Sequence, residues 1–452
     1  MSDTTSPLLT DLYQLNMIQA YLDHGQMRPA VFELFVRKLP QRRQFLLSAG
    51  LETALDYLQT LHFSPGDIDW LASTGRFRSN LIDYLAGFQF TGDVDAMPEG
   101  SVFFADEPML RVTAPLPQAQ LVETRLINIL HYQTLVASKA ARISLLVPDK
   151  LKVDFGLRRA HGADAGLMAA RASYIAGFDG TATLLAEQRF GIPTYGTMAH
   201  SYIEAHDNEA TAFEHFARAR PDDLTLLLDT YDTEAAARRV VVLAPKLAAQ
   251  GIALRNVRLD SGDLLSLSRT VRRILDAGGL SRVKIFASGG LDEDAIAVLA
   301  AESAPIDGLG VGTALTTSSD APALDCAYKL EEYAGLPRRK HSPGKATWPG
   351  RKQVWRQYGP DGAMMCDILS VEGDTQGGEK RIRPVMTEGR RIAPAPGVDA
   401  IRSYAAAELG RLPGNLRRLE PGATYTVRIA EALERVSRET DAWLAAHAGS
   451  LA

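Results

Sequence analysis

Hydrophobic and polar positions follow two different patterns along the chain, and the change falls near residue 150. In the first 120 residues, helical and strand patterns mix without a regular repeat. Apolar residues from Leu12 to Leu22 recur at near-helical spacing and predict a helix over Thr10–His24. Ala30–Arg37 alternates apolar and polar residues and predicts a strand, and Gly50–Leu61 predicts a second helix. This region is therefore expected to be an α+β domain.

After residue 150, short β-rich runs alternate with amphipathic helices. The runs that predict strands are Lys152–Gly156, Pro193–Thr197, Thr225–Tyr231, Asn256–Asp260, Val283–Gly290 and Gly308–Thr313. Helical patterns over Asp232–Ala249 and Asp263–Ala277 lie between them, and a glycine closes each. Six strands separated by helices imply parallel β/α units, which either close into a barrel or form a doubly wound sheet.

The region after residue 330 has a third sequence pattern, in which turn residues recur. Turn signals at Ser342-Pro343-Gly344, Trp348-Pro349-Gly350 and Gly359-Pro360-Asp361-Gly362 predict short β-hairpins. A Pro-rich stretch over Ala393–Gly397 follows, and Thr424–His447 is predicted to be a terminal helix. The three sequence patterns predict an N-terminal α+β domain over residues 1–125, an α/β barrel over 126–330, and C-terminal hairpins with a terminal helix over 331–452.

Composition and charge narrow the function classes. A chain that is 46% hydrophobic and 23% charged is ordinary globular protein, which excludes a disordered or fibrous one. The chain has 49 Lys+Arg and 54 Asp+Glu, so it lacks the excess of positive charge that is typical of proteins that bind nucleic acid or an anionic membrane. Two cysteines, Cys326 and Cys366, exclude a disulfide framework and a Cys-based zinc site. With neither a secretory signal nor a run long enough to span a membrane, the protein is expected in the cytoplasm.

Candidate chemistry gathers where the predicted strands end, because the active site of a β/α barrel lies at the C-terminal ends of its strands. The residues at or just after these ends are Asp154, Phe155, Arg158, Arg159, Thr197, His200, Asp229, Arg258, Asp260, Ser288, Gly289, Gly290, Gly312 and Thr313. This set is unusually polar for positions that follow buried strands. It is therefore the predicted site.

Two of the strand ends are glycine turns that are typical of phosphate binding. Ser288–Gly290 leads into a helix at Asp292, and Gly310–Thr313 ends the next strand. Both offer backbone N–H groups at points where glycine permits close approach, and barrel enzymes often hold a phosphate on consecutive late strands. Glycine also serves the geometry of strand-to-helix turns, but its occurrence on adjacent late strands favours a phosphate site. Neither a P-loop nor a Rossmann fingerprint is present in the sequence.

Four further side chains have both a functional and a structural interpretation. Arg158 and Arg159 concentrate positive charge suited to a pyrophosphate or a carboxylate, and the alternative is a surface pair. Phe155 offers a ring face to a planar substrate, although an aromatic residue at a strand end is more often core. His200 follows a predicted strand, where a lone histidine is usually structural. A histidine metal site is not expected, because His206 falls on a different helix face from His200.

Six separated motifs resemble those of the nicotinate phosphoribosyltransferase family. They are Thr10-Asp11-Leu12-Tyr13-Gln14, Phe32-Glu33 with Arg37-Lys38-Leu39-Pro40, Asp154-Phe155-Gly156-Leu157-Arg158-Arg159, Gly196-Thr197-Met198-Ala199-His200-Ser201, Arg258-Leu259-Asp260-Ser261-Gly262-Asp263 and Gly310-Val311-Gly312-Thr313. The resemblance runs in order from Leu9 to Val354, about three quarters of the chain. Such a series of motifs is highly specific.

The resemblance implies a type II phosphoribosyltransferase. Its fold would be an irregular TIM-like α/β barrel with an additional α+β domain built from the N-terminal and C-terminal regions, working as a homodimer with active sites near the subunit interface. The implied reaction converts nicotinate and phosphoribosyl diphosphate to nicotinate mononucleotide and pyrophosphate, the committed step in salvaging nicotinate into NAD. ATP would be a co-substrate and Mg²⁺ a cofactor, with no nucleic acid or membrane partner.

The resemblance also implies roles for the residues that bind nicotinate and react with ATP. His200 matches a histidine that ATP phosphorylates transiently; a neutral imidazole nitrogen attacks the γ-phosphate and forms a labile phosphoramidate. Tyr13 matches a tyrosine that the partner subunit places over the nicotinate ring, with Phe155 on the other face. Thr197 and Arg258 match nicotinate-binding positions, where a guanidinium suits the substrate carboxylate.

The remaining implied roles concern the sugar and its phosphates. The phosphate-binding set is Ser288, Gly289, Gly290, Gly312 and Thr313. Asp260 and Asp229 would orient ribose hydroxyls or Mg²⁺. Arg158 and Arg159, together with Mg²⁺, would stabilise the departing pyrophosphate while the pyridine nitrogen attacks an oxocarbenium-like ribose.

One motif bears on the choice between nicotinate and nicotinamide. The related nicotinamide enzyme has an aspartate after its Phe-x-Gly-Thr segment, whereas here the segment from Phe178 to Thr181 is followed by Ala182. An extra carboxylate would repel an ionised acid, so its absence favours nicotinate. Asp179 lies nearby, displaced in register.

Three alternatives remain open from the sequence. Quinolinate phosphoribosyltransferase catalyses the same class of transfer with decarboxylation, without ATP or a phosphohistidine. A TIM-barrel sugar-phosphate lyase or isomerase would also need a phosphate cradle. A binding protein that keeps the fold without turnover is the third, and the presence of every motif residue argues against it.

Overall fold

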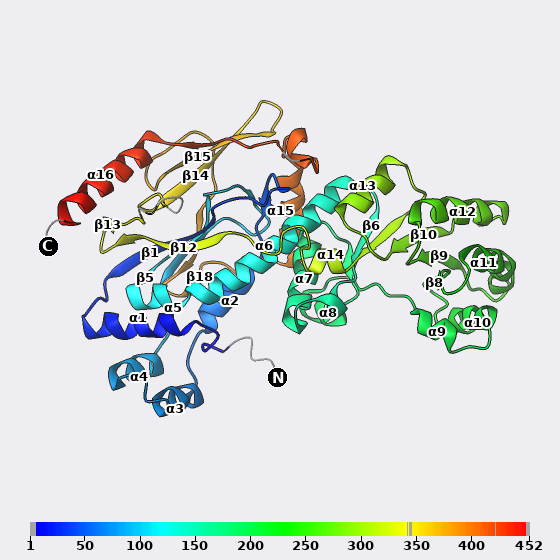
Figure 1. Cartoon of the computed structure of the whole chain (residues 1–452), viewed down its shortest axis with the longest axis horizontal. Helices are drawn as coiled ribbons and strands as arrows, with labels where there is room; N and C mark the ends of the chain where they lie inside the picture. Colours follow the sequence, from blue (N-terminus) through cyan, green and yellow to red (C-terminus); the bar gives the residue numbers. More distant parts are fainter. Residues whose placement is uncertain (1–5, 341, 343–345, 421, 449–452) are drawn as a thin grey trace. The chain divides into compact units, whose positions relative to one another are not determined.

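The chain folds into two compact units, which the computed structural model describes over residues 6–340, 342, 346–420 and 422–448. The first unit contains Met1–Ser138 and Ala323–Ala452, and the second contains Lys139–Pro322 (Figure 1). A long helix, α6 (Glu123–Leu146), begins in the first unit and ends in the second. The turn predicted at Ser342-Pro343-Gly344 lies partly outside the described residues.

The second unit alternates strands and helices. Its strands are β6 (Leu151–Asp154), β7 (Gly180–Thr181), β8 (Leu224–Leu227), β9 (Leu254–Leu259), β10 (Lys284–Ser288) and β11 (Gly308–Val311). Its helices are η1 (Leu157–Arg159), α7 (Ala163–Ile175), α8 (Leu184–Phe190), α9 (His200–Glu204), α10 (Glu209–Ala219), α11 (Thr233–Ala248), α12 (Leu264–Ala277), α13 (Glu293–Ala301) and α14 (Thr313–Thr316). These bounds confirm the predicted β/α units.

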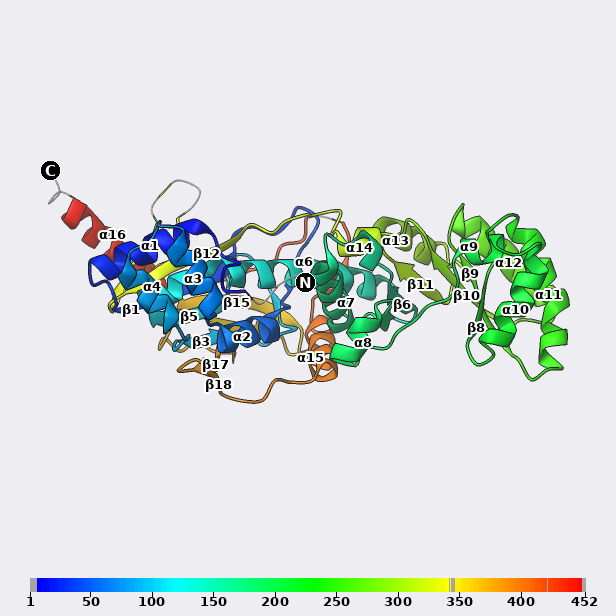
Figure 2. The ribbon, with the colours of Figure 1, turned by 90° about the horizontal axis from the view of Figure 1, so that it is seen from below.

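The strands of this unit form one parallel sheet in the order β7-β6-β11-β10-β9-β8. The sheet is open and curled, which confirms the α/β class and the irregular barrel. Helices α11 and α12 pack on each other and on β9, and Figures 1 and 2 both draw them side by side. Because all six strands run the same way, their C-terminal ends meet at one edge.

One predicted strand is wrong and one strand was not predicted. Pro193–Thr197 contributes only a single bridge, from Thr194 to Thr181. Proline lacks an N–H and glycine has no side chain to bury, so this run does not continue a ladder. It instead crosses directly over Gly180, where an added Cβ would lie 2.3 Å from the Pro193 carbonyl oxygen. The two-residue β7 is too short for a sequence pattern to reveal.

The loops from β8, β9 and β10 to the following helices share one plan. Asp232, Asp263 and Asp292 are the N-caps of α11, α12 and α13, and each carboxylate accepts a hydrogen bond from the backbone N–H three residues on. An N-cap aspartate accepts a hydrogen bond from an otherwise unpaired helix N–H group, and its negative charge is stabilised by the positive end of the helix dipole. The loop after β8 has five residues, and the loops after β9 and β10 have four each. Asp229, Asp260 and Gly289 lie at matching positions, three residues before each cap.

The first unit is an α+β structure. Its helices are α1 (Leu12–Asp23), α2 (Leu51–Thr60), α3 (Pro65–Ser73), α4 (Ser79–Ala86), α5 (Leu116–Leu121), α15 (Val398–Gly410), η2 (Gly414–Arg417) and α16 (Glu431–Ala448). Its strands are β1 (Pro29–Val36), β2 (Leu46–Leu47), β3 (Asp93–Ala96), β4 (Val102–Phe103), β5 (Pro108–Pro115), β12 (Cys326–Tyr333), β13 (Leu336–Pro337), β14 (Lys352–Tyr358), β15 (Met364–Val371), β16 (Glu379–Lys380), β17 (Arg383–Thr387), β18 (Arg390–Arg391) and β19 (Val427–Ile429). These bounds confirm the predicted N-terminal helices and the first strand. The terminal helix is also present, but it begins at Glu431 and not at Thr424, because β19 occupies Val427–Ile429. Helix α15 was not predicted.

Strands from both ends of the chain share the sheets of this unit. The larger sheet has the order β13-β12-β1-β5-β3-β17-β18, and a second sheet has the order β16-β14-β15-β19. Buried charges tie the two sheets together: the Lys352 ammonium lies 2.9 Å from Glu33 and 3.3 Å from Glu331. Glu33 belongs to one of the family motifs, and its side chain is fully buried. Its observed contacts are therefore structural.

No helix within the described residues is long and apolar enough to cross a membrane.

Two aromatic rings fill the space beside β11, where glycines leave room for them. A Cβ atom on Gly310 would lie 2.7 Å from the ring of Phe155, and one on Gly308 would lie 2.7 Å from the ring of Phe286. The two rings lie 5.7 Å apart between centroids. These glycines are needed for space, and they set the position of Phe155 at the end of β6.

We expect Gly310→Ala to lower the free energy of unfolding by about 1–3 kcal/mol, because the added methyl group overpacks the Phe155 ring. Gly410→Ala is the matched control, since Gly410 ends a helix and an added Cβ would have no neighbour within 4 Å. The control should leave stability unchanged or slightly raised. Urea denaturation of both variants gives the comparison, and equal stabilities would contradict this account of β11.

Candidate active site

The Arg258 side chain joins four segments at the edge where the strands end. From β9, its Nε donates to Ser288 Oγ at 2.8 Å, its Nη1 to Thr197 Oγ1 at 3.1 Å, and its Nη2 to Asp260 Oδ1 at 2.7 Å. The guanidinium also lies over the Phe155 ring, 5.3 Å from its centroid. Only 12% of the side chain is exposed. Five predicted site residues therefore form one cluster.

Asp260 links this cluster to His200. Its Oδ1 accepts hydrogen bonds from Arg258 and from Ser288 Oγ, and its Oδ2 lies 3.7 Å from His200 Nε2. Burial acts to raise the pKa of Asp260, but the Ser288 hydrogen bond and the Arg258 charge outweigh it, and the pKa lies below its ordinary value. A negative carboxylate therefore faces the imidazole.

His200 is the first residue of α9 and is held on both sides of its ring. Its Nδ1 lies 3.1 Å from Thr230 Oγ1, and its Nε2 faces Asp260. The side chain is 36% exposed, so a ligand has access to it. His206 has separate partners, the Tyr202 carbonyl oxygen and His215. An oriented, accessible imidazole beside a carboxylate is suited to nucleophilic or acid–base chemistry.

Asp229 connects the ends of β8 and β9. Its Oδ2 accepts hydrogen bonds from the Asp260 backbone N–H at 3.0 Å and from the Ser261 hydroxyl. Its Oδ1 is buried and has no hydrogen-bond partner within the described part of the chain. A buried acceptor without a partner is costly, so this oxygen is suited to a cation or a ligand hydroxyl.

The turn after β10 depends on glycine. Gly289 and Gly290 have φ angles of +88° and +64°, in the left-handed region that favours glycine. A Cβ atom on Gly289 would lie 1.7 Å from the Asp260 carbonyl oxygen, so no other residue fits there. Both glycines are exposed. The first predicted phosphate turn thus packs directly on the Arg258–Asp260 segment.

The predicted arginine pair lies beside the second glycine turn. Arg158 and Arg159 form the exposed turn η1, which packs against α14, the helix that begins at Thr313. A Cβ atom on Gly312 would lie 3.0 Å from the Phe155 carbonyl oxygen. Neither guanidinium makes a hydrogen bond or an ion pair within the residues that the structure describes. The pair is thus available to an anion.

Asp154 shapes the turn that carries Phe155 and the arginines. It is fully buried; its Oδ1 accepts from the Gly156 N–H at 2.8 Å and its Oδ2 from Thr181 Oγ1 at 2.8 Å. Burial raises the pKa of this carboxyl to about 6, although the hydrogen bonds from Thr181 and Gly156 act to lower it. Its contacts hold the chain, so we assign it no substrate role.

Asp179 lies away from the cluster. Its Oδ2 accepts a hydrogen bond from the Lys152 backbone N–H at 2.8 Å and lies 3.6 Å from the Lys152 ammonium. The carboxylate is thus engaged with the second residue of β6, on the strand itself. The preference for nicotinate over nicotinamide stays a prediction.

Tyr13 belongs to α1 in the first unit, and its role across a subunit interface stays a prediction. The side chain is 45% exposed. Partial burial and the neighbouring Glu123 raise the pKa of its hydroxyl to about 12, so the phenol stays neutral. An exposed neutral aromatic side chain is suited to covering a flat ligand.

Sequence reasoning assigned no role to three residues of this cluster. Thr230 contacts His200, Ser261 contacts Asp229, and the Phe286 ring lies beside Phe155. A local signal existed for two of them, because Thr230 and Ser261 directly follow the two predicted aspartates, Asp229 and Asp260.

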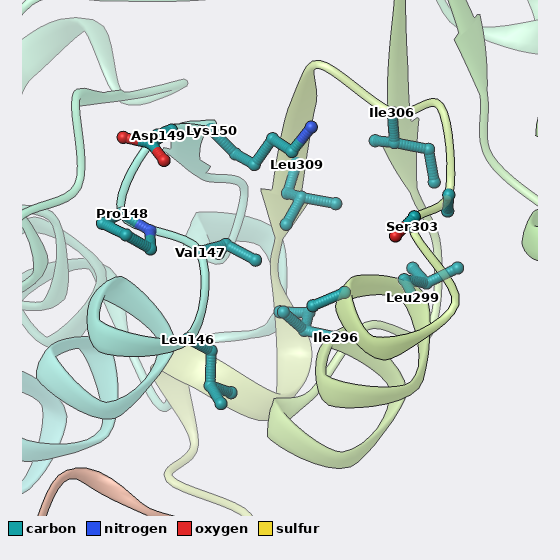
Figure 3. Close-up of a pocket in the computed structure, with 12 residues that line it drawn as sticks. Leu146, Val147, Pro148, Asp149, Lys150, Ile296, Leu299, Ser303, Ile306 and Leu309 are labelled. Carbon is teal, nitrogen blue, oxygen red and sulfur yellow. The ribbon is translucent and has the colours of Figure 1, made fainter. Parts of the chain in front are cut away.

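A cavity of about 310 Å³ lies in the second unit, beside the loop that leads into β6. Figure 3 shows Ile296 and Leu299 of α13 facing Val147 and Leu309 across it. Its wall is mainly aliphatic and contains none of the predicted site residues. The N-terminal side of barrel strands serves stability rather than catalysis, so we assign this cavity to packing.

Replacing Asp154 tests the effect of its burial on stability. Its pKa is about 6 in the folded chain against an ordinary 3.8, so ionisation opposes folding. The stability contributed by the neutral carboxyl is present below about pH 4 and is lost as the pH rises through 6. Asp154→Asn keeps groups for both hydrogen bonds but cannot ionise. Between about pH 4 and 7, wild type should lose about 3 kcal/mol of unfolding free energy relative to the variant. Parallel pH profiles in urea denaturation would refute this.

Comparison with known proteins places the chain in a family. Three family models match: the nicotinate phosphoribosyltransferase (NAPRTase) N-terminal domain at residues 8–131, the NAPRTase family at 151–334, and the C-terminal domain at 376–437. Nicotinate phosphoribosyltransferase pncB2 of Mycobacterium tuberculosis is 47% identical over 94% of this chain and 91% of its own. The Bacillus subtilis nicotinate phosphoribosyltransferase is 43% identical over 78% of this chain and 74% of its own.

Solved structures agree with the sequence comparisons. Human nicotinic acid phosphoribosyltransferase matches with a TM-score of 0.85 and 30% identity, over 95% of this chain and 99% of its own. Nicotinate-nucleotide pyrophosphorylase from Pyrococcus furiosus has a TM-score of 0.74 at 24% identity, over 90% of this chain and 96% of its own, which shows a shared fold. On the family models and the two bacterial relatives, the chain belongs to the nicotinate phosphoribosyltransferase family.

Proposed function

We propose that this protein transfers the phosphoribosyl group of phosphoribosyl diphosphate to nicotinate, giving nicotinate mononucleotide and pyrophosphate. The observation that carries the proposal is the Arg258 guanidinium, held over Phe155 by Thr197, Ser288 and Asp260. The guanidinium has five N–H donors, and the Nη2 hydrogen that is not bonded to Asp260 would donate to the substrate carboxylate. The neighbouring aromatic ring provides an apolar surface for the pyridine. The pocket thus suits a flat aromatic acid.

The two glycine turns and the arginine pair would hold the diphosphate sugar. Gly289 and Gly290 are exposed and have left-handed backbone conformations, and without side chains they would let backbone N–H groups approach an anion closely. Arg158 and Arg159 would stabilise the charge that develops on pyrophosphate as its bond to the ribose breaks. The pyridine nitrogen then bonds to the same carbon. The protein's contribution is to position both reactants and to stabilise the leaving group.

Mg²⁺ fits the acids of this site. Asp229 would offer its Oδ1, which lacks a hydrogen-bond partner within the described residues, and Asp260 lies next to it. No group of three or more His, Cys, Asp or Glu side chains able to hold a metal is found in the described ranges. Mg²⁺ needs no such cage, because one or two carboxylates and substrate phosphates usually hold it. When bound, it would neutralise charge on the diphosphate.

ATP would couple to the reaction through His200. An imidazole nitrogen would bond to the γ-phosphorus as the bond from that phosphorus to ADP breaks. Thr230 fixes the ring orientation, and Asp260 would stabilise the positive charge that the phosphorylated ring carries. The lowered pKa of Asp260 supports this role, because the carboxylate stays ionised at neutral pH.

A homodimer would complete the site. The half-exposed Tyr13 would lie over the nicotinate ring bound by the partner subunit, opposite Phe155. Tyrosine is suited to this position because its ring covers apolar surface while its hydroxyl stays hydrated.

Arg258→Lys tests the acid-binding role. Lysine keeps the charge but cannot bond to Thr197, Ser288 and Asp260 at once, so the KM for nicotinate should rise by about 10–100-fold. Arg255→Lys is the control, because Arg255 lies on the same strand, is exposed and bonds only to a backbone carbonyl oxygen among its described contacts. Steady-state kinetics would give both values. An unchanged nicotinate KM in Arg258→Lys, or turnover of quinolinate without ATP, would contradict the proposed substrate.

His200→Ala tests the coupling to ATP. The variant should form nicotinate mononucleotide at the same rate with and without ATP, because it lacks the nitrogen that accepts the phosphoryl group. His206→Ala is the matched control: His206 lies just beyond α9 and does not contact Asp260. It should keep the ATP stimulation of wild type. Full stimulation in His200→Ala would rule out a phosphohistidine at this position.

A further inference from the structure

Four buried charged side chains form a cluster next to the helix and the turn that follow the two predicted phosphate turns. Lys139 and Arg142 lie on α6, Glu293 is the first residue of α13, and Asp320 lies in the turn after α14. The Lys139 ammonium lies 2.5 Å from Glu293 and 2.8 Å from Asp320, and Arg142 Nη1 lies 3.3 Å and 3.2 Å from the same two acids. No side chain of the four is more than 9% exposed.

The cluster joins two loops to one helix. Glu293 follows Gly290 by three residues, and Asp320 follows the short helix that begins at Thr313. The strands before these loops, β10 and β11, pair through Ser288 and Gly310. Lys139 and Arg142 of α6 each contact both Glu293, which follows the first turn, and Asp320, which follows the second. The spacing of the two phosphate turns is therefore tied to a single rigid element.

Stability alone is a weak reason for such an arrangement. Taking four charges out of water costs free energy that their mutual attraction only partly returns, and apolar residues of similar volume often stabilise a core as well. What ion pairs provide is a fixed distance and direction, since two acids that share two bases have few alternative arrangements. The cluster is thus suited to holding a geometry.

We propose that the Lys139–Arg142–Glu293–Asp320 cluster is a positioning device that sets the gap between the Ser288–Gly290 turn and the Gly312–Thr313 turn, and thereby the affinity for the diphosphate group. The inference rests on the proposed function in one respect, that these turns bind phosphoribosyl diphosphate. The four side chains act through the loops and do not touch the substrate themselves.

Binding of phosphoribosyl diphosphate to the full-length protein, measured by calorimetry with Mg²⁺, tests the proposal independently of turnover. In Glu293→Gln one acid loses its charge, and the dissociation constant should rise about tenfold. The KM for nicotinate should stay within about twofold of wild type, because the Arg258 contacts remain. The single variant Lys139→Arg keeps the positive charge within reach of both acids, so it should bind phosphoribosyl diphosphate nearly as tightly as wild type does.

Glu209→Gln is the matched control. Glu209 is also the first residue of a helix, α10, is 3% exposed and pairs with Arg239. Losing this pair should cost stability but leave phosphoribosyl diphosphate binding unchanged. If Glu293→Gln fails to fold, Lys139→Met with Glu293→Gln replaces it, because one acid and one base remain and the charge stays balanced. The double variant should also bind about tenfold more weakly.

The outcomes separate the two proposals. If wild type binds phosphoribosyl diphosphate and every folded cluster variant binds it equally tightly, the positioning role is overturned and the proposed function is unaffected. An equal loss of affinity in Glu209→Gln would overturn it too, since general destabilisation would then explain the effect. Absence of binding by wild type would count against the proposed function itself.

Discussion

The Arg258 guanidinium is the constraint on which the strand-end cluster depends. Its three nitrogens contact separate groups while its flat face lies on Phe155, so each partner must be correctly placed for the others to fit. The guanidinium is nearly buried, and a buried cation without its partners is strongly unfavourable. The strand ends are therefore held in register before any substrate arrives, and binding need not order them.

Three β/α loops share the same spacing to the helix that follows. Asp229, Asp260 and Gly289 each lie three residues before an N-cap aspartate, so they occupy matching places relative to the start of that helix. Two places carry acids that link to one another, through the Asp260 N–H and Asp229 Oδ2. At the third, a side chain would strike the Asp260 carbonyl oxygen, so the position is glycine. The same spacing before a helix cap thus carries an acid in two loops and a glycine in the third.

Local signals predict much of this unit, and long-range contacts set the rest. The bounds of α11 and α12 agree with the sequence to within one residue, because N-cap aspartates and closing glycines act locally. The polar strand ends were also predictable, since parallel strands end at one edge. The prediction over Pro193–Thr197 failed because the pairing stops after one bridge, beside a partner strand, β7, that is only two residues long. The contact between His200 and Thr230, thirty residues apart, depends on where α9 begins, and no local pattern encodes it.

Charge is distributed differently below and above the strand ends. Beneath the phosphate turns, Lys139 and Arg142 are balanced by two acids, and Arg258 is balanced by Asp260. The arginine pair of η1 lies at the surface and lacks such partners among the described residues. Buried charge must be paired, whereas exposed charge keeps its hydration until a ligand replaces it. The positive charge of the arginine pair therefore adds to the local potential without weakening the fold, because it stays where water reaches it.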